Sequence, residues 1–525
     1  MVPIVPHANR LSSVRLQIVR GVLTETRAVL DGIRVPCYVV GGLLRDAQLG
    51  RTLGSVRHFL ATPHGGAPGS VSRAPDWINI DLAVPRDALK AARQLAESLG
   101  GAFVPLDEAT DTARVVVERG GARCELDVSA FRGASIEDDL RRRDFTMNAM
   151  AMALGDWLDD PRNPKRAIDP LRGRQAIERR VLSACFDQTF DEDPLRVLRG
   201  FRFIVQLGVE AAPDLERLMV RGVPGLARVS GERIRDELIA ICMTDRAHEA
   251  LRGLERVGAL DVIVPELVPG RGLDQGPFHH LDVLSHQLEA VEQADRFLAD
   301  YAEFSPALQA PLLAYCGEEL VERRPRKALI KLAALLHDVG KPSSRQVHPD
   351  GEIWFIGHEQ TGLALAQQVV ERLRLSNREA HMVCQLVLHH LRPGFLSREP
   401  QLTRRALYRF YKDLADDGPA CALEWWADRM ATRGTKSRVD QIDQQRVFLE
   451  ELLMAYFFKA EEVVKPPKLV DGHALMQAFS LPPGPGVGVL LEAIEEAQAE
   501  GRVRSRDEAM ALAKTLLQVP PAPKP

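Results

Sequence analysis

The sequence contains few cysteines, and their spacing excludes two kinds of structural framework. Its 525 residues include seven cysteines, which are scattered and form no C-x-x-C pair. Disulfide-stapled domains and cysteine-based zinc sites need cysteines that are paired or closely spaced. The pattern therefore favours a reducing compartment, and we expect a cytoplasmic protein.

Long apolar segments are also missing. No run approaches the roughly 20 apolar residues that a membrane-spanning helix needs. Residues 1–21 lack the continuous apolar core of a signal peptide. The sequence therefore predicts no membrane partner.

No single sign of charge dominates the chain. The formal net charge is −4, and 45% hydrophobic with 27% charged residues is typical of globular proteins. Binding of nucleic acid would depend on local basic segments, namely LRRRDF (140–145), RNPKR (162–166) and RRPRK (323–327). Taken singly, such a segment is more often a solvated helix face.

The patterning divides the chain into a mixed N-terminal part and a helical remainder. We expect a helix at 11–31, buried strands at 35–42 and 77–84, a helix at 86–99, and a hairpin around RGGAR (119–123). From about residue 170 onward helical patterns dominate, with a last helix at 488–517. Residues 52–75 are rich in Gly, Pro and Ser and are predicted to form a long loop, and 518–525 a disordered tail.

A glycine pair follows the first expected strand. Gly41 and Gly42 lie between that strand and a helix, where backbone N–H groups without a hindering side chain suit a triphosphate. A glycine pair alone more often marks a turn, so this motif needs support from its neighbours.

Acidic residues occur at alternate positions of two strands. Asn79 and Asp81 share one strand face, and so do Glu125 and Asp127. Three carboxylates converging from adjacent strands could hold two Mg²⁺ ions, which activate a hydroxyl and stabilise a leaving pyrophosphate. Considered alone, they are more simply exposed acids on a half-solvated sheet face.

Two later segments combine arginines with acids. DLRRRDFTMNAMAM (139–152) surrounds a helix start with arginines, an Asp and an Asn. DEDPLRVLRGFRF (191–203) would place Asp193 and Arg196 on one helix face, where an acceptor and a donor could read a base edge. An ordinary i,i+3 ion pair is the simpler alternative.

The order of these motifs resembles the class II tRNA nucleotidyltransferase and bacterial poly(A) polymerase family, within the DNA polymerase β superfamily. Six segments match in family order over roughly residues 36–260: YVVGGLLRDAQLGR, NIDLAV, DVSAFR, RRRDFTMNAMA, DPLRG and EDPLRVLRGFRF. The resemblance implies an α+β head with a palm-like mixed sheet, followed by a mostly α-helical neck. It also implies template-independent transfer from ATP or CTP to the tRNA 3′ end.

The resemblance also assigns roles to individual residues. It implies that Gly41, Gly42 and Arg45 bind phosphate, that Asp81 and Asp127 bind Mg²⁺, that Arg143, Asp144 and Asn148 contact the ribose, and that Glu192, Asp193 and Arg196 select the base. Asn79 departs from the family, which has an acid at that position. An amide oxygen carries no charge, and Mg²⁺ favours carboxylates, so Glu125 is the better-placed third acid.

A second constellation lies in residues 279–428. His286, the doublet His337-Asp338 at the end of a Leu/Ala-rich helix, His358, His389 and Asp428 are spread over expected helices. One buried histidine is more often a satisfied core residue. Several such positions with an adjacent His-Asp pair favour a metal site, because charged groups are rarely buried unpaired.

This pattern resembles the HD superfamily of metal-dependent phosphohydrolases. The core would be His286, His337, Asp338 and Asp428, with His358 and His389 as the extra ligands of two-metal members and Lys341 near a phosphate. The resemblance implies a divalent metal of unspecified identity. Some bacterial CCA-adding enzymes carry such a domain after the polymerase part.

Together the patterns predict six regions: 1–35 an N-terminal helix, 36–170 the head, 171–265 the nucleotide-selecting neck, 275–435 the HD domain, 440–517 a helical domain that contacts tRNA, and 518–525 the tail. Three functions stay open at this point. The chain adds nucleotides to tRNA 3′ ends, or its head only binds RNA while the HD domain is the working phosphohydrolase, or it is a non-catalytic RNA-binding protein.

Overall fold

The computed structural model describes residues 7–48, 76–399, 401–437, 439–464 and 467–518. The long loop expected at 52–75 and the expected tail after residue 518 lie outside these ranges. The chain forms two compact units, Met1–Glu237 with Gly253–Ile263, and Leu238–Arg252 with Val264–Pro525. Within the described residues, no helix is both long and apolar enough to cross a membrane.

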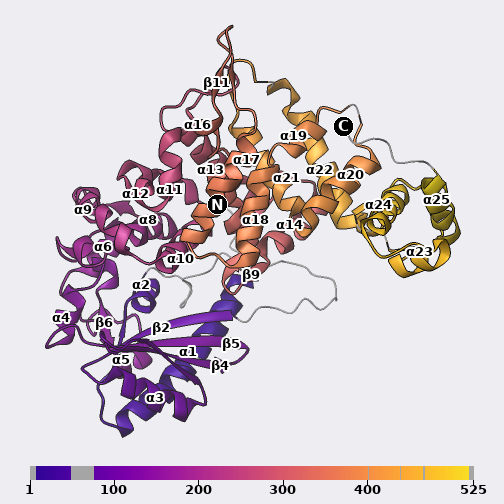
Figure 1. The fold of residues 1–525 in the computed structure, drawn as a ribbon. Helices are drawn as coiled ribbons and strands as arrows, with labels where there is room; N and C mark the ends of the chain where they lie inside the picture. Colours follow the sequence, from indigo (N-terminus) through magenta and orange to yellow (C-terminus); the bar gives the residue numbers. More distant parts are fainter. Residues whose placement is uncertain (1–6, 49–75, 400, 438, 465–466, 519–525) are drawn as a thin grey trace. The chain divides into compact units, whose positions relative to one another are not determined.

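The first unit is built on a six-stranded mixed sheet (Figure 1). The strands follow the order β3-β4-β5-β2-β1-β6, and only β2 and β5 run parallel. Their bounds are β1 Tyr38–Val40, β2 Asp76–Val84, β3 Ala102–Asp107, β4 Thr112–Arg119, β5 Ala122–Ala130 and β6 Ala151–Ala153. This confirms the expected hairpin, since β4 and β5 pair antiparallel.

Alternation along β2 separates a core face from a face that carries polar groups. Ile78, Ile80 and Leu82 are buried, and the intervening Asn79 and Asp81 are partly exposed. On the core side, α3 (Ala88–Leu99) packs against β4 and β5, and α1 (His7–Gly32) packs against α3. The polar side chains of β2 are thus directed away from the hydrophobic core.

Short elements and helices follow as far as Ile263, and the division at Leu238–Arg252 gives parts of α10 and α11 to the second unit. They are α2 Gly42–Gln48, α4 Ile136–Arg141, η2 Thr146–Asn148, α5 Leu154–Asp159, α6 Gly173–Arg179, β7 Val181–Leu182, α7 Thr189–Glu192, α8 Arg196–Leu207, β8 Glu210–Ala211, α9 Leu215–Gly222, η3 Val223–Arg228, α10 Gly231–Cys242, α11 Ala247–Arg256 and α12 Ala259–Ile263. The helices α8 to α11 confirm the helical patterns expected after residue 190. Gly253 lies directly against the ring of Phe201, where a Cβ would come 2.3 Å from the ring.

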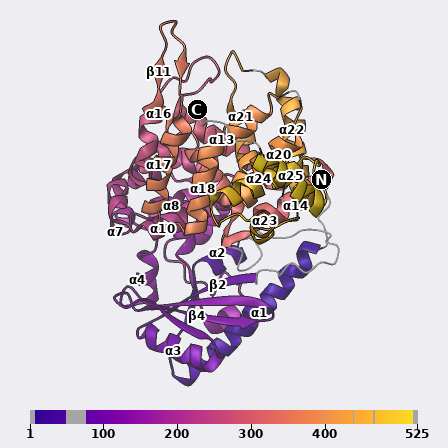
Figure 2. The ribbon, with the colours of Figure 1, turned by 45° about the vertical axis from the view of Figure 1, so that its right-hand side comes forward.

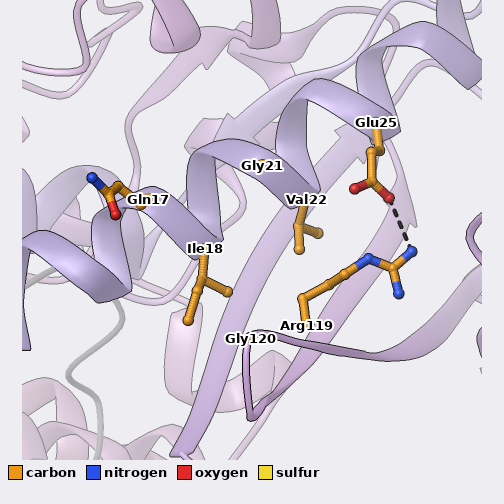
Figure 3. Close-up of a pocket in the computed structure, with 7 residues that line it drawn as sticks. All are labelled: Gln17, Ile18, Gly21, Val22, Glu25, Arg119 and Gly120. Atoms are coloured by element: carbon orange, nitrogen blue, oxygen red, sulfur yellow. Dashed lines mark hydrogen bonds and ion pairs between the residues drawn. The ribbon is translucent and has the colours of Figure 1, made fainter.

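A shallow pocket of about 300 Å³ lies between α1 and the β4–β5 turn (Figure 3). Ile18, Val22 and the Glu25–Arg119 ion pair line it, at 2.9 Å between Oε2 and Nη2. None of its lining residues belongs to the candidate sites described below.

The second unit contains a helical bundle around one fully buried helix. α15 (Arg326–Leu336) buries every residue, as a helix with apolar side chains on most of its surface does in a core. It packs against α13 (Val283–Asp300), α18 (Asn377–His389) and α21 (Gly418–Ala431), and α17 (His358–Arg372) packs against α18 (Figure 2).

The remaining elements of this unit are η4 Pro265–Gly270, α14 Pro306–Gly317, β9 Glu319–Val321, β10 Arg324–Pro325, α16 Lys341–Ser344, β11 Gln346–Val347, β12 Ile353–Trp354, α19 Arg392–Leu396, α20 Arg404–Leu414, η5 Ala415–Asp417, η6 Val439–Gln441, α22 Ile442–Phe458 and η7 Ala460–Val464. These elements are mostly helical, as expected.

The C-terminal segment has a small core of its own, which includes Leu475, Leu490 and Ile494. Its helices are α23 Gly472–Phe479, α24 Pro485–Ala499 and α25 Arg506–Gln518. The prediction of a single last helix at 488–517 was wrong, because the chain turns after Ala499 and forms α24 and α25 instead. Gly501 has φ +78°, which ends a helix at low cost only for glycine.

Candidate functional sites

The parallel pairing of β2 with β5 brings the polar strand residues together. Asn79 lies opposite Glu125, and Asp81 lies opposite Asp127. Residues two apart share a strand face, so the register places all four side chains on one side of the sheet. The structure thus assembles the carboxylates that the sequence pattern indicated.

Arg114, which the sequence analysis did not single out, lies on the next strand. In β4 it pairs with Asp127. Its Nε and Nη2 donate to the two Asp127 carboxylate oxygens at 2.7 and 2.8 Å, and Nη1 lies 3.1 Å from Glu125 Oε2. One guanidinium therefore contacts two of the three carboxylates.

Gly41 lies against Asp81 at the end of β1. Its φ is +67°, and a Cβ there would come 3.2 Å from Asp81 Oδ2 and 3.6 Å from Arg143 Nη1. Backbone conformation and space both favour glycine at this point. Its N–H donates to Met150 O, so an N–H for a phosphate would have to come from the first turn of α2, which begins at Gly42.

The Asp81 carboxyl lies in a strongly charged environment. Burial and the neighbouring Asp127 raise its pKa, whereas Arg143, Arg199 and Arg45 lower it. On balance the pKa of Asp81 lies above its usual value, and a bound cation would offset the repulsion between Asp81 and Asp127.

Arg45, expected at a phosphate, instead anchors a buried polar network. It donates to Asp46 Oδ1 through Nε and Nη2, at 3.0 and 2.8 Å, and to Asn148 Oδ1 through Nη1, at 2.7 Å. Asn148 in turn donates to Asp144 Oδ1 at 3.2 Å. The structure therefore places Arg45 behind Asn148, as a support for the residues that the resemblance assigned to the ribose.

Asp144 is held ionised by helix α8. Arg199 donates to its Oδ2 through Nε and Nη2, at 3.1 and 2.7 Å. Burial raises the pKa of Asp144, but Arg199 and the bonds from Asn148 and the Phe145 N–H outweigh it and lower the pKa to about 2. Glu237 continues the network by pairing with Arg199 at 3.4 Å and Arg202 at 2.7 Å.

Arg143 occupies a place between the network and the metal face. Its guanidinium pairs with Asp139 at 3.0 Å and lies beside Gly41. The resemblance assigns Arg143 to the ribose, and a guanidinium at this position could also pair with a phosphate.

The expectation that Asp193 and Arg196 share one helix face was wrong. Asp193 has an extended conformation (φ −138°, ψ 96°) after α7, and α8 begins only at Arg196. Pro194 explains the break, because a residue before proline is disfavoured in the α region. Glu192 is exposed at the end of α7.

The two expected base-reading residues are nevertheless fixed by neighbours. Asp193 accepts from Arg233 Nη2 at 2.9 Å. Arg196 is buried and donates to Thr189 Oγ1 at 2.7 Å and to the carbonyl oxygens of Thr189 and Arg142. These contacts hold an acceptor and a donor three residues apart without a shared helix.

The second site is a compact cluster at the end of α15. His286 Nε2 lies 2.9 Å from Asp428 Oδ1, and His337 Nε2 lies 3.0 Å from Asp338 Oδ2. Asp338 Oδ1 also lies 3.3 Å from His358 Nε2. Among the described residues, the groups with three potential ligand atoms within 4.8 Å of one another are His286-His337-Asp338 and Asp338-His358-His390.

His390, not His389, joins this cluster, which corrects the expectation. His358 Nε2 and His390 Nε2 are 3.2 Å apart, and His390 is buried whereas His389 is only partly buried. Consecutive residues at the end of a helix point about 100° apart, so only one of the pair can face the bundle interior.

The cluster has the properties of a metal site. Nδ1 of His337, His358 and His390 each lies 2.7–2.8 Å from a carbonyl oxygen three residues earlier, which directs Nε2 into the cluster. His337 Nε2 is buried between Asp338 Oδ2 at 3.0 Å and Asp428 Oδ1 at 3.6 Å, with hydrogen-bond geometry to neither. Burial first, and the neighbouring His337 next, lower the pKa of His390 to about 3, so its ring is neutral, as a ligand must be.

Three further residues at this cluster were not singled out from the sequence. The His279 ring lies 4.6 Å from that of His286. Gln275 accepts from Lys341 Nζ at 2.7 Å, and Lys341 lies 2.6 Å from Asp338 Oδ2, as expected for a lysine near the site. Glu424 is buried one helical turn before Asp428, and burial raises its pKa to about 8.

Three family descriptions match the chain. Residues 37–183 match the poly A polymerase head domain, 208–270 the probable RNA and SrmB-binding site of polymerase A, and 283–416 the HD domain. The matches follow one another in the order that the motifs indicated.

Relatives with established names match most of the chain. An A-adding tRNA nucleotidyltransferase of Deinococcus radiodurans is 35% identical over 85% of this chain and 93% of its own. A CC-adding tRNA nucleotidyltransferase of Thermus thermophilus is 34% identical over 86% and 92%. The fold is similar to that of the Bacillus stearothermophilus CCA-adding enzyme in complex with CTP, with TM-score 0.58, 22% identity, and coverage of 95% and 97%.

Proposed function

This chain belongs to the tRNA nucleotidyltransferase and poly(A) polymerase family, and from this premise we propose that its first unit transfers CMP or AMP from CTP or ATP to the 3′ end of tRNA. The observation that carries the proposal is the pairing of Asp81 with Asp127 on parallel strands, beside Gly41.

The reaction breaks the phosphoanhydride bond between the α- and β-phosphates of the nucleotide and forms a phosphodiester bond. The 3′-hydroxyl oxygen of the RNA bonds to the α-phosphorus of the nucleotide, the bond from that phosphorus to the bridging oxygen breaks, and pyrophosphate leaves. The hydroxyl proton passes to solvent or a nearby base. The residues of this chain have to hold the two reactants in line and offset negative charge on the phosphates.

Asp81 and Asp127 are the residues that would hold Mg²⁺ in the head. Both family domains are generally divalent-metal-dependent, and a carboxylate pair beside a glycine turn fits such an ion. A bound ion there would assist deprotonation of the hydroxyl and offset charge on the leaving group. Asn79 would add at most a neutral amide oxygen.

Cationic and polar groups around this face would bind the nucleotide. Arg143, beside Gly41, is placed for the triphosphate together with the Gly42 N–H. Asn148 and Asp144 are placed for the ribose, and Asp193 with Arg196 for the base edge. Arg45 and Arg199 would act by fixing Asn148 and Asp144 rather than by touching the nucleotide.

The test uses purified protein with labelled CTP or ATP and three tRNA transcripts, one without the terminal CCA, one ending in C and one ending in CC. Incorporation of CMP into the first two transcripts only indicates CC addition. Incorporation of AMP into the last only indicates A addition, and incorporation into all three indicates CCA addition. No incorporation of either nucleotide with Mg²⁺ or Mn²⁺ would reject the proposal.

We further propose that the HD part hydrolyses a phosphoester. The cluster around Asp338 supports this, because histidines and carboxylates are the donor set of hydrolytic metal sites. Lys341 lies at its edge, where an ammonium can pair with a phosphate. Release of phosphate from a phosphomonoester or opening of a cyclic phosphate by wild type, but not by Asp338→Ala, would support it, and equal rates would reject it.

The alternative in which the head only binds RNA is less favoured. The relatives that cover most of the chain are named for nucleotide addition. The reaction is placed in the cytoplasm, in keeping with seven free cysteines.

A further inference from the structure

Arg114 is an unexpected residue at a face that is proposed to hold cations. It contacts both oxygens of Asp127 and lies 3.1 Å from Glu125. Its side chain is 25% exposed, so the guanidinium lies at the solvent boundary and is shielded on one side by the sheet. A planar guanidinium that donates two parallel hydrogen bonds to a carboxylate fixes the orientation of that carboxylate.

The geometry leaves Asp127 only part of its coordinating capacity. A carboxylate has about four lone-pair sites, and the two parallel bonds from Arg114 use one on each oxygen. The remaining lone pairs point along the other edges of the group. Asp127 can therefore still ligate a cation, but from a direction that Arg114 determines.

The charges on this face also differ from those of a site with an acid at position 79. Asp81, Glu125 and Asp127 carry three negative charges, and Arg114 carries one positive charge. The resulting formal charge of −2 is balanced by one divalent cation. A second divalent cation would meet both the amide of Asn79 and the guanidinium, and like charges at such distances repel strongly away from bulk water.

A structural difference between the two sites agrees with this count. The HD cluster contains two groups of three residues whose potential ligand atoms lie within 4.8 Å of one another. Among the described residues of the head, no such group occurs. Arg114 contacts both Asp127 and Glu125, and the oxygens of these two acids do not form a three-atom group with Asp81 within that limit.

We propose that Arg114 is the positioning residue of this face, where it orients Asp127 and serves as a fixed positive charge, so that the head without nucleotide holds one divalent cation rather than two. The proposal rests on the proposed role of Asp81 and Asp127 as metal ligands. The proposal also links Asn79 to Arg114. The amide at position 79 removes a negative charge and Arg114 adds a positive one, so both lower the number of cations needed to neutralise the face.

The test is the number of Mn²⁺ ions bound per chain, measured by electron paramagnetic resonance without nucleotide or tRNA. Wild type is compared with Arg114→Lys, Arg114→Gln, and Arg114→Gln combined with Asn79→Asp. The HD cluster is the same in all four proteins, so any difference in the count comes from the head. Arg119→Gln is the matched control, since Arg119 lies on the same strand and its ion pair with Glu25 is away from the face.

The combined variant should bind about one more Mn²⁺ than wild type, because β2, β4 and β5 then present four acids and no guanidinium, and Arg143 at the edge is paired with Asp139. Arg114→Lys should keep the wild-type count but bind Mn²⁺ about 10-fold more weakly, as when a metal ligand loses an orienting partner. An unchanged count in the combined variant, with its circular dichroism spectrum intact, would overturn the proposal, as would unchanged affinity in Arg114→Lys.

This measurement is independent of nucleotide transfer. If transfer is absent while the counts change as stated, the proposed function fails and the role of Arg114 stands. If transfer is present while the counts do not change, the role of Arg114 fails and the proposed function stands.

Discussion

Asp144 and Arg199 form an ion pair that joins the segment between α4 and η2 to helix α8, with 2.7 Å between Oδ2 and Nη2. The carboxylate is almost fully buried, whereas the guanidinium side chain is 34% exposed. Removal of Arg199 leaves Asp144 buried with only the bonds from Asn148 and the Phe145 N–H, and removal of Asp144 leaves Arg199 with Glu237 alone.

We therefore expect Arg199→Met to destabilise the first unit by about 2 kcal/mol, less than the 3–5 kcal/mol typical of a fully buried pair because solvent screens the exposed side. A double-mutant cycle with Asp144→Asn, followed by urea unfolding, measures the coupling. Additive effects of the two substitutions would contradict a direct interaction.

The same pair predicts a pH dependence. The folded-state pKa of Asp144 is lowered to about 2, against an ordinary value of 3.8. A lowered pKa adds stability that is present above pH 3.8 and is lost as the pH falls toward 2. The stability difference between wild type and Asp144→Asn should shrink over that interval in urea-unfolding curves, and a constant difference would argue against an ionised Asp144.

The HD cluster offers a matched pair of adjacent histidines. His390→Ala removes a buried ring whose Nε2 lies 3.2 Å from that of His358. This substitution should weaken the affinity of the cluster for its metal at least about 10-fold. His389→Ala should leave metal content unchanged. Plasma emission analysis of the two proteins distinguishes them, and equal metal loss in both would show that the assignment of His390 is wrong.

Glu424 is a buried residue of α21, one helical turn before Asp428 of the same cluster. Its pKa of about 8 means that the carboxyl is mostly protonated at neutral pH, with burial as the main cause. Glu424→Gln is nearly isosteric with the neutral acid and should keep both stability and metal content. Glu424→Ala should cost about 2–3 kcal/mol through the cavity that it leaves, and a larger loss in the glutamine variant, seen by thermal unfolding, would indicate a required negative charge.

Much of this organisation was predictable from residue patterns. Alternation of apolar and polar residues in 77–84 placed Asn79 and Asp81 on one face, and the structure confirms it. The break at Pro194 and the turn at Gly501 were also present in the sequence, since proline and glycine are strong local signals, but both were overlooked.

Other features depend on pairings that local sequence does not determine. Arg114 reaches Asp127 only because β4 pairs with β5 in one register. His390 rather than His389 faces Asp338 because of the rotation of α18, and Arg45 turns toward Asn148 through a contact 103 positions away. Such contacts follow from tertiary structure.

The most direct test of the account compares two carboxylate variants in one assay. Incorporation of labelled CMP or AMP into tRNA lacking its CCA end is measured for wild type, Asp81→Asn and Asp338→Ala. We expect Asp81→Asn to lose at least about 100-fold in rate, because a ligand of a proposed catalytic ion loses its charge. Asp338→Ala should add nucleotides at the wild-type rate. Retained activity in Asp81→Asn, or loss of addition only in Asp338→Ala, would contradict the account.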